Sequence, residues 1–203
     1  MGNLIKQIAI FGYADTKSKD ELYQEVVSVA KALAEASFIV VDGGGPGAMR
    51  AATEGAHLGK GKAIGVTFYP KDTMDFEGRD LENRFDEEIK TQNYVERTLT
   101  LMKEGQVYVI FKGGTGTISE FGMAWGLARL DFGHHKPLIL YGKFWEKIID
   151  SFKENMLLRP EELKVFKIVS SPQGVLQAIR DFEEEIAKGE HQHLQITKGD
   201  FSI

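Results

Sequence analysis

The chain has 203 residues, of which 42% are hydrophobic and 27% are charged, and its net charge is −5. This length suits one sizeable core, and the acidic balance argues against non-specific binding to nucleic acid or anionic membranes. The absence of cysteine excludes disulfides and thiolate metal sites, and no apolar run reaches membrane-spanning length or resembles a signal peptide, so we expect a cytoplasmic protein.

Short apolar runs alternate with amphipathic stretches along the chain. The predicted strands span residues 5–12, 38–41, 63–68, 106–111, 136–141 and 165–170. The predicted helices span residues 20–36, 47–59, 93–104, 116–130, 144–157 and 172–188. Ser18 and Glu21 fit a capping box at the start of the first helix. Residues 70–91 are polar and irregular, and are predicted to form a mobile loop.

Strands that alternate with helices imply right-handed βαβ crossovers. The predicted fold class is therefore α/β, with a three-layer, doubly wound, mostly parallel sheet of the Rossmann-like kind. We predict one nucleotide-binding domain over residues 1–188 and a C-terminal tail over residues 189–203. In such sheets, ligands bind at the carboxyl ends of the strands.

Two glycine-rich loops directly follow predicted strands, which places them on the same edge of the sheet. A glycine loop that opens a helix lets backbone N–H groups approach an anion, and threonine hydroxyls add further donors. A tight turn alone also explains either loop, but two loops at one edge favour a nucleotide-sized ligand. Neither the dinucleotide pattern G-x-G-x-x-G nor a P-loop is present. The residues predicted to bind phosphate or nucleotide are Gly43, Gly44, Gly45, Gly113, Gly114, Thr115, Gly116 and Thr117.

Three charged residues accompany these loops. Glu120 either completes a capping box with Thr117 or lies beside the sugar of a bound nucleotide. Arg97 is either a solvated or salt-bridged side chain or a ligand contact. Asp42 ends the second predicted strand, where it either caps the next helix or touches a ribose hydroxyl.

Three segments, in this order and spacing, resemble the LOG ("Lonely Guy") family, whose members were long mislabelled as lysine decarboxylases. They are "GGGPGAMRAATEGA" (43–56), "ERTLTLM" (96–102) and "GGTGTISE" (113–120). The resemblance covers roughly residues 5–185. It implies a Rossmann-like homodimer that hydrolyses the N-glycosidic bond of a nucleoside 5′-monophosphate, such as AMP or a cytokinin riboside monophosphate, to free base and ribose 5-phosphate. In this phosphoribohydrolase, Arg97 and Glu120 match the catalytic positions, and no cofactor or metal is expected.

The sequence departs from the family pattern at several positions. Lys112 replaces a proline, Ser119 replaces a glutamate that many members carry, and Thr98 follows Arg97 where the family has lysine. Similar departures occur in LOG-like proteins described as molybdenum-cofactor carriers, which bind a phosphorylated pterin without hydrolysing it. A non-catalytic carrier of a phosphorylated ligand is therefore the alternative function.

The remaining candidates concern partners and metals. Helix 116–130 carries more apolar residues than one buried stripe needs, including Phe121 and Trp125, which favours a homodimer surface. His134 and His135 are interpreted as solvated loop residues. The i, i+2 spacing of His191 and His193 could bind a metal, but two histidines without a carboxylate make a weak site. The expected partners are a small-molecule nucleotide and a second copy of the chain, with no nucleic acid and no membrane.

Overall fold

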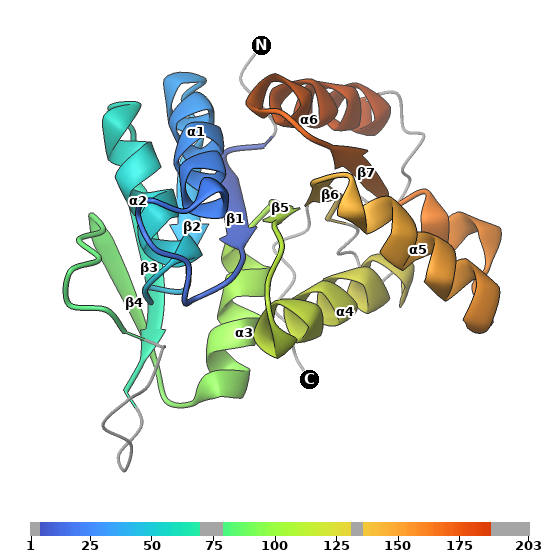
Figure 1. Cartoon of the computed structure of the whole chain (residues 1–203), viewed down its shortest axis with the longest axis horizontal. Coiled ribbons are helices and arrows are strands. Elements are labelled where there is room, and N and C mark those ends of the chain that lie inside the picture. The colour runs from blue at the N-terminus through green and yellow to red at the C-terminus, as the bar shows by residue number, and fades with distance from the viewer. Residues whose placement is uncertain (1–4, 70–78, 131–135, 188–203) are drawn as a thin grey trace.

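Seven parallel strands form one sheet in the computed structural model, which describes residues 5–69, 79–130 and 136–187 (Figure 1). Across the sheet the order of the strands is β4-β3-β2-β1-β5-β6-β7. Their bounds are β1 Gln7–Phe11, β2 Ile39–Asp42, β3 Ala63–Phe68, β4 Glu87–Thr91, β5 Val107–Ile110, β6 Leu138–Tyr141 and β7 Phe166–Val169. Strands β3, β5 and β6 are buried along their whole length, as expected for parallel strands covered on both faces.

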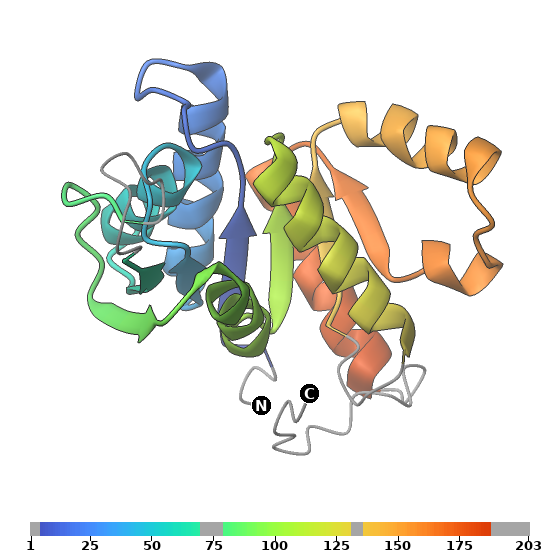
Figure 2. The same ribbon diagram turned by 90° about the horizontal axis from the view of Figure 1, so that it is seen from below.

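Helices cover both faces of this sheet. The helices on one face are α1 (Glu21–Glu35), α2 (Ala48–Leu58) and α6 (Pro172–Ala187). On the other face lie α3 (Tyr94–Glu104), α4 (Thr115–Leu130) and α5 (Phe144–Asn155), with a short 3₁₀ turn at Pro160–Leu163. Figure 2 shows α3 and α4 lying across the near side of the sheet, with α1 and α6 behind it. The prediction of a three-layer, doubly wound α/β fold is confirmed.

Helix α1 illustrates why these segments fold as they do. Its buried side chains recur at helical spacing and form one apolar stripe against the sheet, while the residues between them face outward. Val26, Ala30 and Leu33 on this stripe are fully buried. The predicted capping box at its start is wrong, because Asp20 rather than Ser18 is the N-cap residue. The Asp20 carboxylate accepts a hydrogen bond from the Lys17 N–H at 2.7 Å and so orders the preceding turn.

Strand β4 was not predicted, because residues 70–91 were expected to be irregular throughout. Residues 70–78 lie outside the described part of the chain, but Glu87–Thr91 pairs with β3 over five registered positions. This strand is at the edge of the sheet, and only Ile89 is apolar in the sequence EEIKT. Charges on an edge strand discourage pairing with other chains. Because of these charges the strand has no apolar run, so the sequence pattern did not identify it.

Helix α4 carries the aromatic residues that were predicted to form a homodimer surface. Phe121 is buried, and the Trp125 ring packs 5.1 Å from it and 5.9 Å from Phe152 of α5. The Trp125 indole N–H donates to the Glu162 carbonyl oxygen at 2.7 Å. These side chains therefore stabilise their own chain, and homodimerisation stays a prediction without support from them. None of the helices in the described ranges is long and apolar enough to cross a membrane.

The strand order reverses between β1 and β5. The chain first builds outward from β1 to β4, and then returns to place β5 on the other side of β1. Parallel strands leave a crevice at the carboxyl side of such a switch point, where ligands bind in open α/β sheets. Hydrogen bonds from the Tyr13 N–H to the Lys112 carbonyl (3.2 Å) and from the Ala48 N–H to the Tyr13 carbonyl (2.9 Å) tie the surrounding loops together.

Candidate functional site

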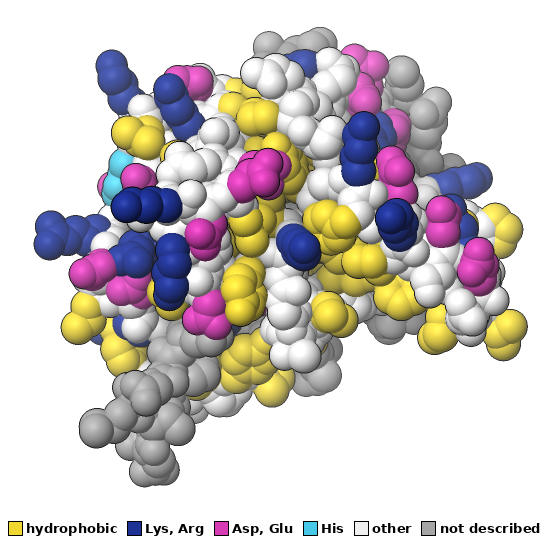
Figure 3. Space-filling model, viewed as in Figure 1, with side chains coloured by type: hydrophobic (Ala, Val, Ile, Leu, Met, Phe, Trp, Pro, Cys, Tyr) yellow, Lys and Arg dark blue, Asp and Glu magenta, His cyan; other side chains and the backbone are white. Residues whose placement is uncertain are grey.

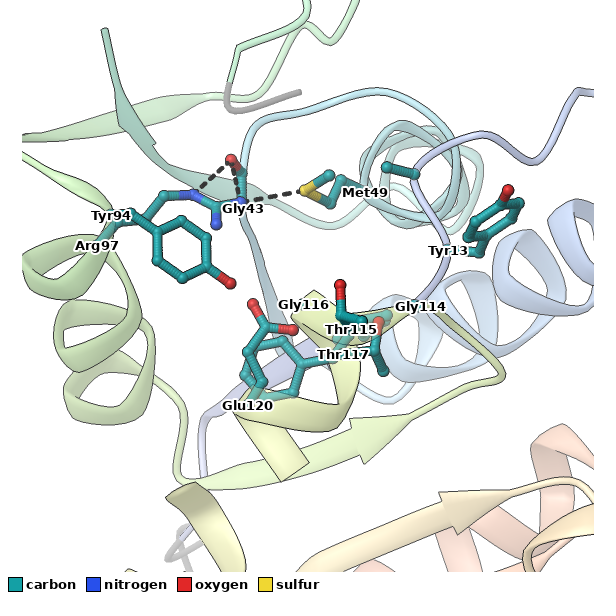
Figure 4. A pocket seen from close by; sticks show the side chains of 14 residues that line it. Tyr13, Gly43, Met49, Tyr94, Arg97, Gly114, Thr115, Gly116, Thr117 and Glu120 are labelled. Carbon is teal, nitrogen blue, oxygen red and sulfur yellow. Dashed lines mark hydrogen bonds between the residues drawn. The ribbon is translucent and has the colours of Figure 1, made fainter. Parts of the chain in front are cut away.

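A cavity of about 250 Å³ lies at this switch point, where the loops after β1, β2 and β5 meet the N-terminal halves of α3 and α4 (Figure 4). On the face seen in Figure 3, hydrophobic side chains form a band over β1 and β5, and charged side chains crowd the flanks. The residues that line the cavity are Ile10, Phe11, Gly12, Tyr13, Ala14, Gly43, Met49, Tyr94, Arg97, Gly114, Thr115, Gly116, Thr117 and Glu120. We refer to this cavity as the switch-point pocket.

The loop after β5 forms the floor of the switch-point pocket. Helix α4 begins at Thr115, so the N–H groups of its first turn have no intrahelical acceptor and stand at the positive end of the helix dipole. A Cβ built on Gly114 would have no atom within 4 Å, which means that this backbone is open to a ligand. Gly113 does not line the pocket, because it packs against the Thr117 side chain instead. This arrangement can hold an anion.

The loop after β2 contributes much less to the pocket. Of its three predicted binding residues only Gly43 lines the cavity, while Gly44 and Gly45 do not. Gly44 has a φ of +69°, a backbone conformation that favours glycine, and its Cα faces the Thr67 side chain. A Cβ on Gly43 would lie 1.7 Å from an Arg97 nitrogen. These glycines therefore allow close packing rather than ligand approach.

Arg97 is buried, with only 5% of its surface exposed. Its Nε donates to the Val66 carbonyl oxygen at 3.0 Å, and its Nη2 donates to the Gly43 carbonyl oxygen at 2.9 Å. The guanidinium thus fastens the carboxyl ends of β2 and β3 together and presents its charge to one wall of the pocket. The alternative of a solvated side chain is wrong for this residue.

Glu120 projects from α4 into the centre of the pocket (Figure 4). The side chain is 8% exposed. No hydrogen bond to its carboxylate is found among the described residues, and its oxygens are not among the fully buried polar atoms that lack a partner. Burial raises the pKa of Glu120 to about 7, although the nearby charge of Arg97 opposes this shift. The capping-box alternative is wrong, because α4 already begins at Thr115 and places Thr117 inside the helix.

Asp42 is also buried, but it does not line the pocket. Its carboxylate accepts hydrogen bonds from the Gly44 N–H (2.7 Å) and the Thr53 hydroxyl (2.8 Å). The Asn83 amide reaches the same carboxylate at 3.3 Å and also donates to the Gly45 carbonyl oxygen at 3.0 Å. Burial raises the pKa of Asp42 to about 6 against these hydrogen bonds. Asp42 therefore orders the loop after β2, and neither the ribose contact nor the helix cap describes its position.

Sequence reasoning missed several residues of this site. Tyr94 lies one helical turn before Arg97 on the same face of α3, a spacing that was available as a signal. Tyr13 and Met49 line the pocket from the loop after β1 and from α2, and no local pattern marks them. Asn83 fixes the loop after β2 from a segment that was expected to be irregular.

The other candidates lie elsewhere. Lys112 is exposed and does not line the pocket, and its ammonium lies 6.0 Å from the Phe144 ring. The four histidines at 134, 135, 191 and 193 lie outside the described residues. Within the described ranges, no group of three or more histidine, aspartate or glutamate side chains is placed to hold a metal ion.

Comparison with known families gives one clear match. The model of the SLOG cluster4 family matches residues 5–163, which is most of the chain. No curated protein is significantly similar in sequence.

Several solved structures share the fold. The molybdenum cofactor binding protein from Rippkaea orientalis is 19% identical, with a TM-score of 0.65 over 88% of this chain and 97% of that one. The molybdenum cofactor carrier protein from Chlamydomonas reinhardtii is 21% identical, with a TM-score of 0.62 over 87% and 97%. DNA processing protein A from Helicobacter pylori, described by its single-stranded DNA binding mode, is 15% identical, with a TM-score of 0.53 over 91% and 81%. With such a protein among the similar structures, the predicted exclusion of nucleic acid as a partner is not supported.

Proposed function

The chain belongs to the SLOG cluster4 family, as its resemblance to the LOG family predicted, and we propose that it hydrolyses the N-glycosidic bond of a nucleoside 5′-monophosphate. The products are the free base and ribose 5-phosphate. One observation carries this proposal: Glu120 is a buried carboxylate, without a hydrogen-bond partner in the described part of the chain, that projects into the pocket beside the N-terminus of its own helix, α4. Burying such a group destabilises a fold, and perturbed carboxylates of this kind concentrate at catalytic sites.

The 5′-phosphate binds at the first turn of α4. Gly114, Thr115, Gly116 and Thr117 line the pocket at this turn, and the N–H groups of a helix's first turn have no intrahelical acceptor, so they are available to a phosphate. Binding energy from the phosphate orients the ribose over Glu120, which follows one turn later on the same helix.

Cleavage builds positive charge on the ribose ring as the bond between C1′ and the base nitrogen lengthens. An ionised Glu120 stabilises that charge and accepts a proton from the attacking water, whose oxygen forms the new bond to C1′. The bonding electrons leave with the base, which takes up a proton. Arg97 holds the wall of the pocket through Gly43 and Val66, and its charge favours the ionised form of Glu120.

The second candidate function is binding of a phosphorylated ligand without cleavage. It is favoured by the similar fold of two proteins named as binding or carrying the molybdenum cofactor. A carrier would use the same helix N-terminus for the phosphate. It would have no use for the charge of Glu120.

The test is to incubate the protein with a panel of nucleoside 5′-monophosphates and to measure released base by chromatography. We expect release from at least one of them, and we expect Glu120→Gln to lower kcat at least about 100-fold while nucleotide affinity changes little. Glu146→Gln, which alters an exposed glutamate on α5, is the matched control and should retain full activity. Binding without release by the wild-type protein would reject the hydrolase and favour the carrier.

A further inference from the structure

Tyr94 stands beside the proposed catalytic carboxylate, yet no step of the proposed reaction uses it. The side chain is 38% exposed and lines the switch-point pocket from the first residue of α3. Figure 4 shows its hydroxyl and the Glu120 carboxylate pointing into the same space, below the guanidinium of Arg97. A Cβ built on Gly116 would lie 3.5 Å from this hydroxyl, so the phenol also reaches the first turn of α4.

The position of Tyr94 is well determined by its neighbours. Asn93 caps α3 by accepting a hydrogen bond from the Glu96 N–H at 2.9 Å, and Glu96 in turn accepts one from the Gln92 N–H at 2.8 Å. The Tyr94 ring packs edge-on against Phe68, with centroids 6.2 Å apart. The guanidinium of Arg97 lies 6.0 Å from the centre of the ring.

Ser119 lies beside the Tyr94 hydroxyl. The Ser119 hydroxyl donates its single proton to the Gly116 carbonyl oxygen at 2.8 Å. Either oxygen could be the donor in the 3.5 Å contact between the Ser119 and Tyr94 hydroxyls, but while Ser119 donates to Gly116 it can only accept from Tyr94. The lone pairs of the Tyr94 oxygen then remain to accept a hydrogen bond, and the Glu120 carboxylate points into the same space (Figure 4).

We propose that Tyr94, oriented by Ser119, acts with Glu120 as a pair of adjacent acceptors that recognises the two neighbouring hydroxyl groups of a ribose. One sugar hydroxyl donates to Glu120 and the other to Tyr94, while the 5′-phosphate lies at the first turn of α4. Tyr94 is then a specificity-determining residue that selects ribonucleotides over deoxyribonucleotides. This inference rests on the proposed binding of a nucleoside monophosphate, but it does not require cleavage.

The physical basis is the cost of an unpaired polar group. A site built to accept a hydrogen bond from a hydroxyl loses affinity for the analogue that lacks it, because the acceptor is left desolvated without a partner. Tyr94 is partly exposed, so water recovers some of this loss. We therefore expect a preference of about 10-fold from the Tyr94 contact, at the lower end of such effects.

The experiment compares affinities by isothermal titration calorimetry for AMP, 2′-deoxy-AMP and 3′-deoxy-AMP. The wild-type protein should bind AMP more tightly than at least one deoxy analogue by about 10-fold or more. Tyr94→Phe removes only the hydroxyl. It should remove most of the preference for AMP over one deoxy analogue without weakening the binding of that analogue. Ser119→Ala should lower the same preference by a smaller factor, because the Tyr94 hydroxyl is then free to rotate.

Tyr69→Phe is the matched control. Its hydroxyl contacts Glu88 at the edge of the sheet, outside the switch-point pocket, and the preference should be unchanged. The inference would be overturned if the wild-type protein and Tyr94→Phe had equal ratios of affinity for AMP to affinity for each deoxy analogue. It would also be overturned if none of the three nucleotides bound. A Tyr94-dependent preference in a protein that releases no base would support the inference and reject only the hydrolase. Base release by a protein whose affinity ratio is unchanged in Tyr94→Phe would support the hydrolase and reject only the role of Tyr94.

Discussion

The two glycine-rich loops look alike in sequence but differ in what their glycines contact. In the loop after β2, a Cβ on Gly43 or Gly44 would lie within 2.3 Å of a neighbouring side chain. In the loop after β5, a Cβ on Gly113 would also lie too close to a side chain, at 2.1 Å from the Thr117 hydroxyl, but Gly114 is open and a Cβ on Gly116 would make only an ordinary contact at 3.5 Å. The first loop uses glycine so that the protein can pack closely on itself. The second leaves backbone exposed at Gly114 and Gly116, which is what a ligand needs.

A buried carboxylate lies near each loop, and the two carboxylates differ in whether other groups of the protein hydrogen-bond to them. Asp42 accepts hydrogen bonds from Gly44, Thr53 and Asn83 and holds the first loop in place. Glu120 faces the pocket with no such partner within the described ranges. A satisfied buried carboxylate serves the fold, whereas an unsatisfied one reduces stability and requires another reason to be there.

The largest expected effect is on the first loop. Gly43→Ala places a methyl group 1.7 Å from the present position of the Arg97 Nη2, so the guanidinium must leave the Gly43 carbonyl oxygen. We expect the free energy of unfolding in urea to fall by about 3 kcal/mol, and base release to fall with it. Gly122→Ala, on α4, is the control, because a Cβ there would meet no atom within 4 Å. This substitution should stabilise the helix by about 0.5–1 kcal/mol. Equal stability of the two variants would contradict the packing role of Gly43.

Much of this comparison could be anticipated from the sequence, but not all of it. Alternating apolar runs and helical stripes predicted the doubly wound sheet, and glycine after a strand predicted both loops. The pattern alone could not separate the two loops, because the difference depends on Arg97 and Thr67, which come from distant segments. Strand β4 was missed because an edge strand needs little apolar surface. The spacing of Tyr94 and Arg97 predicts a shared face of α3, but only the packing of α3 against α4 shows that this face borders the pocket.

The second prediction concerns the carboxylates and the pH dependence of stability. The pKa of Glu120 in the folded protein, about 7, lies above its ordinary value of 4.5. The native state therefore holds an extra proton between these values, and the free energy of unfolding falls as the pH rises through this window. The loss reaches at most roughly 3 kcal/mol above pH 7. Urea denaturation of Glu120→Gln should show a smaller loss than the wild-type protein between pH 5 and pH 8.

Asp42 provides the internal control for that measurement. Its pKa of about 6 is also raised from 3.8, so it contributes its own loss of stability between these pH values. Because Asp42 is present in both proteins, its contribution cancels in the difference between them. Parallel stability curves for the wild-type protein and Glu120→Gln would show that the Glu120 carboxylate is not buried as described.

The smallest effect on stability is expected in the second loop, where the effect on binding is larger. Gly114→Ala adds a methyl group in open space, so the free energy of unfolding should change by less than about 1 kcal/mol. The same methyl group occupies the approach to the first turn of α4, and we expect affinity for AMP, measured by calorimetry, to fall about 10-fold. Gly43→Ala should thus lower mainly the stability of the protein, and Gly114→Ala mainly its affinity for AMP. If Gly114→Ala bound AMP as well as the wild-type protein, the phosphate would have to lie elsewhere, and the distinction between a packing loop and a binding loop would fail.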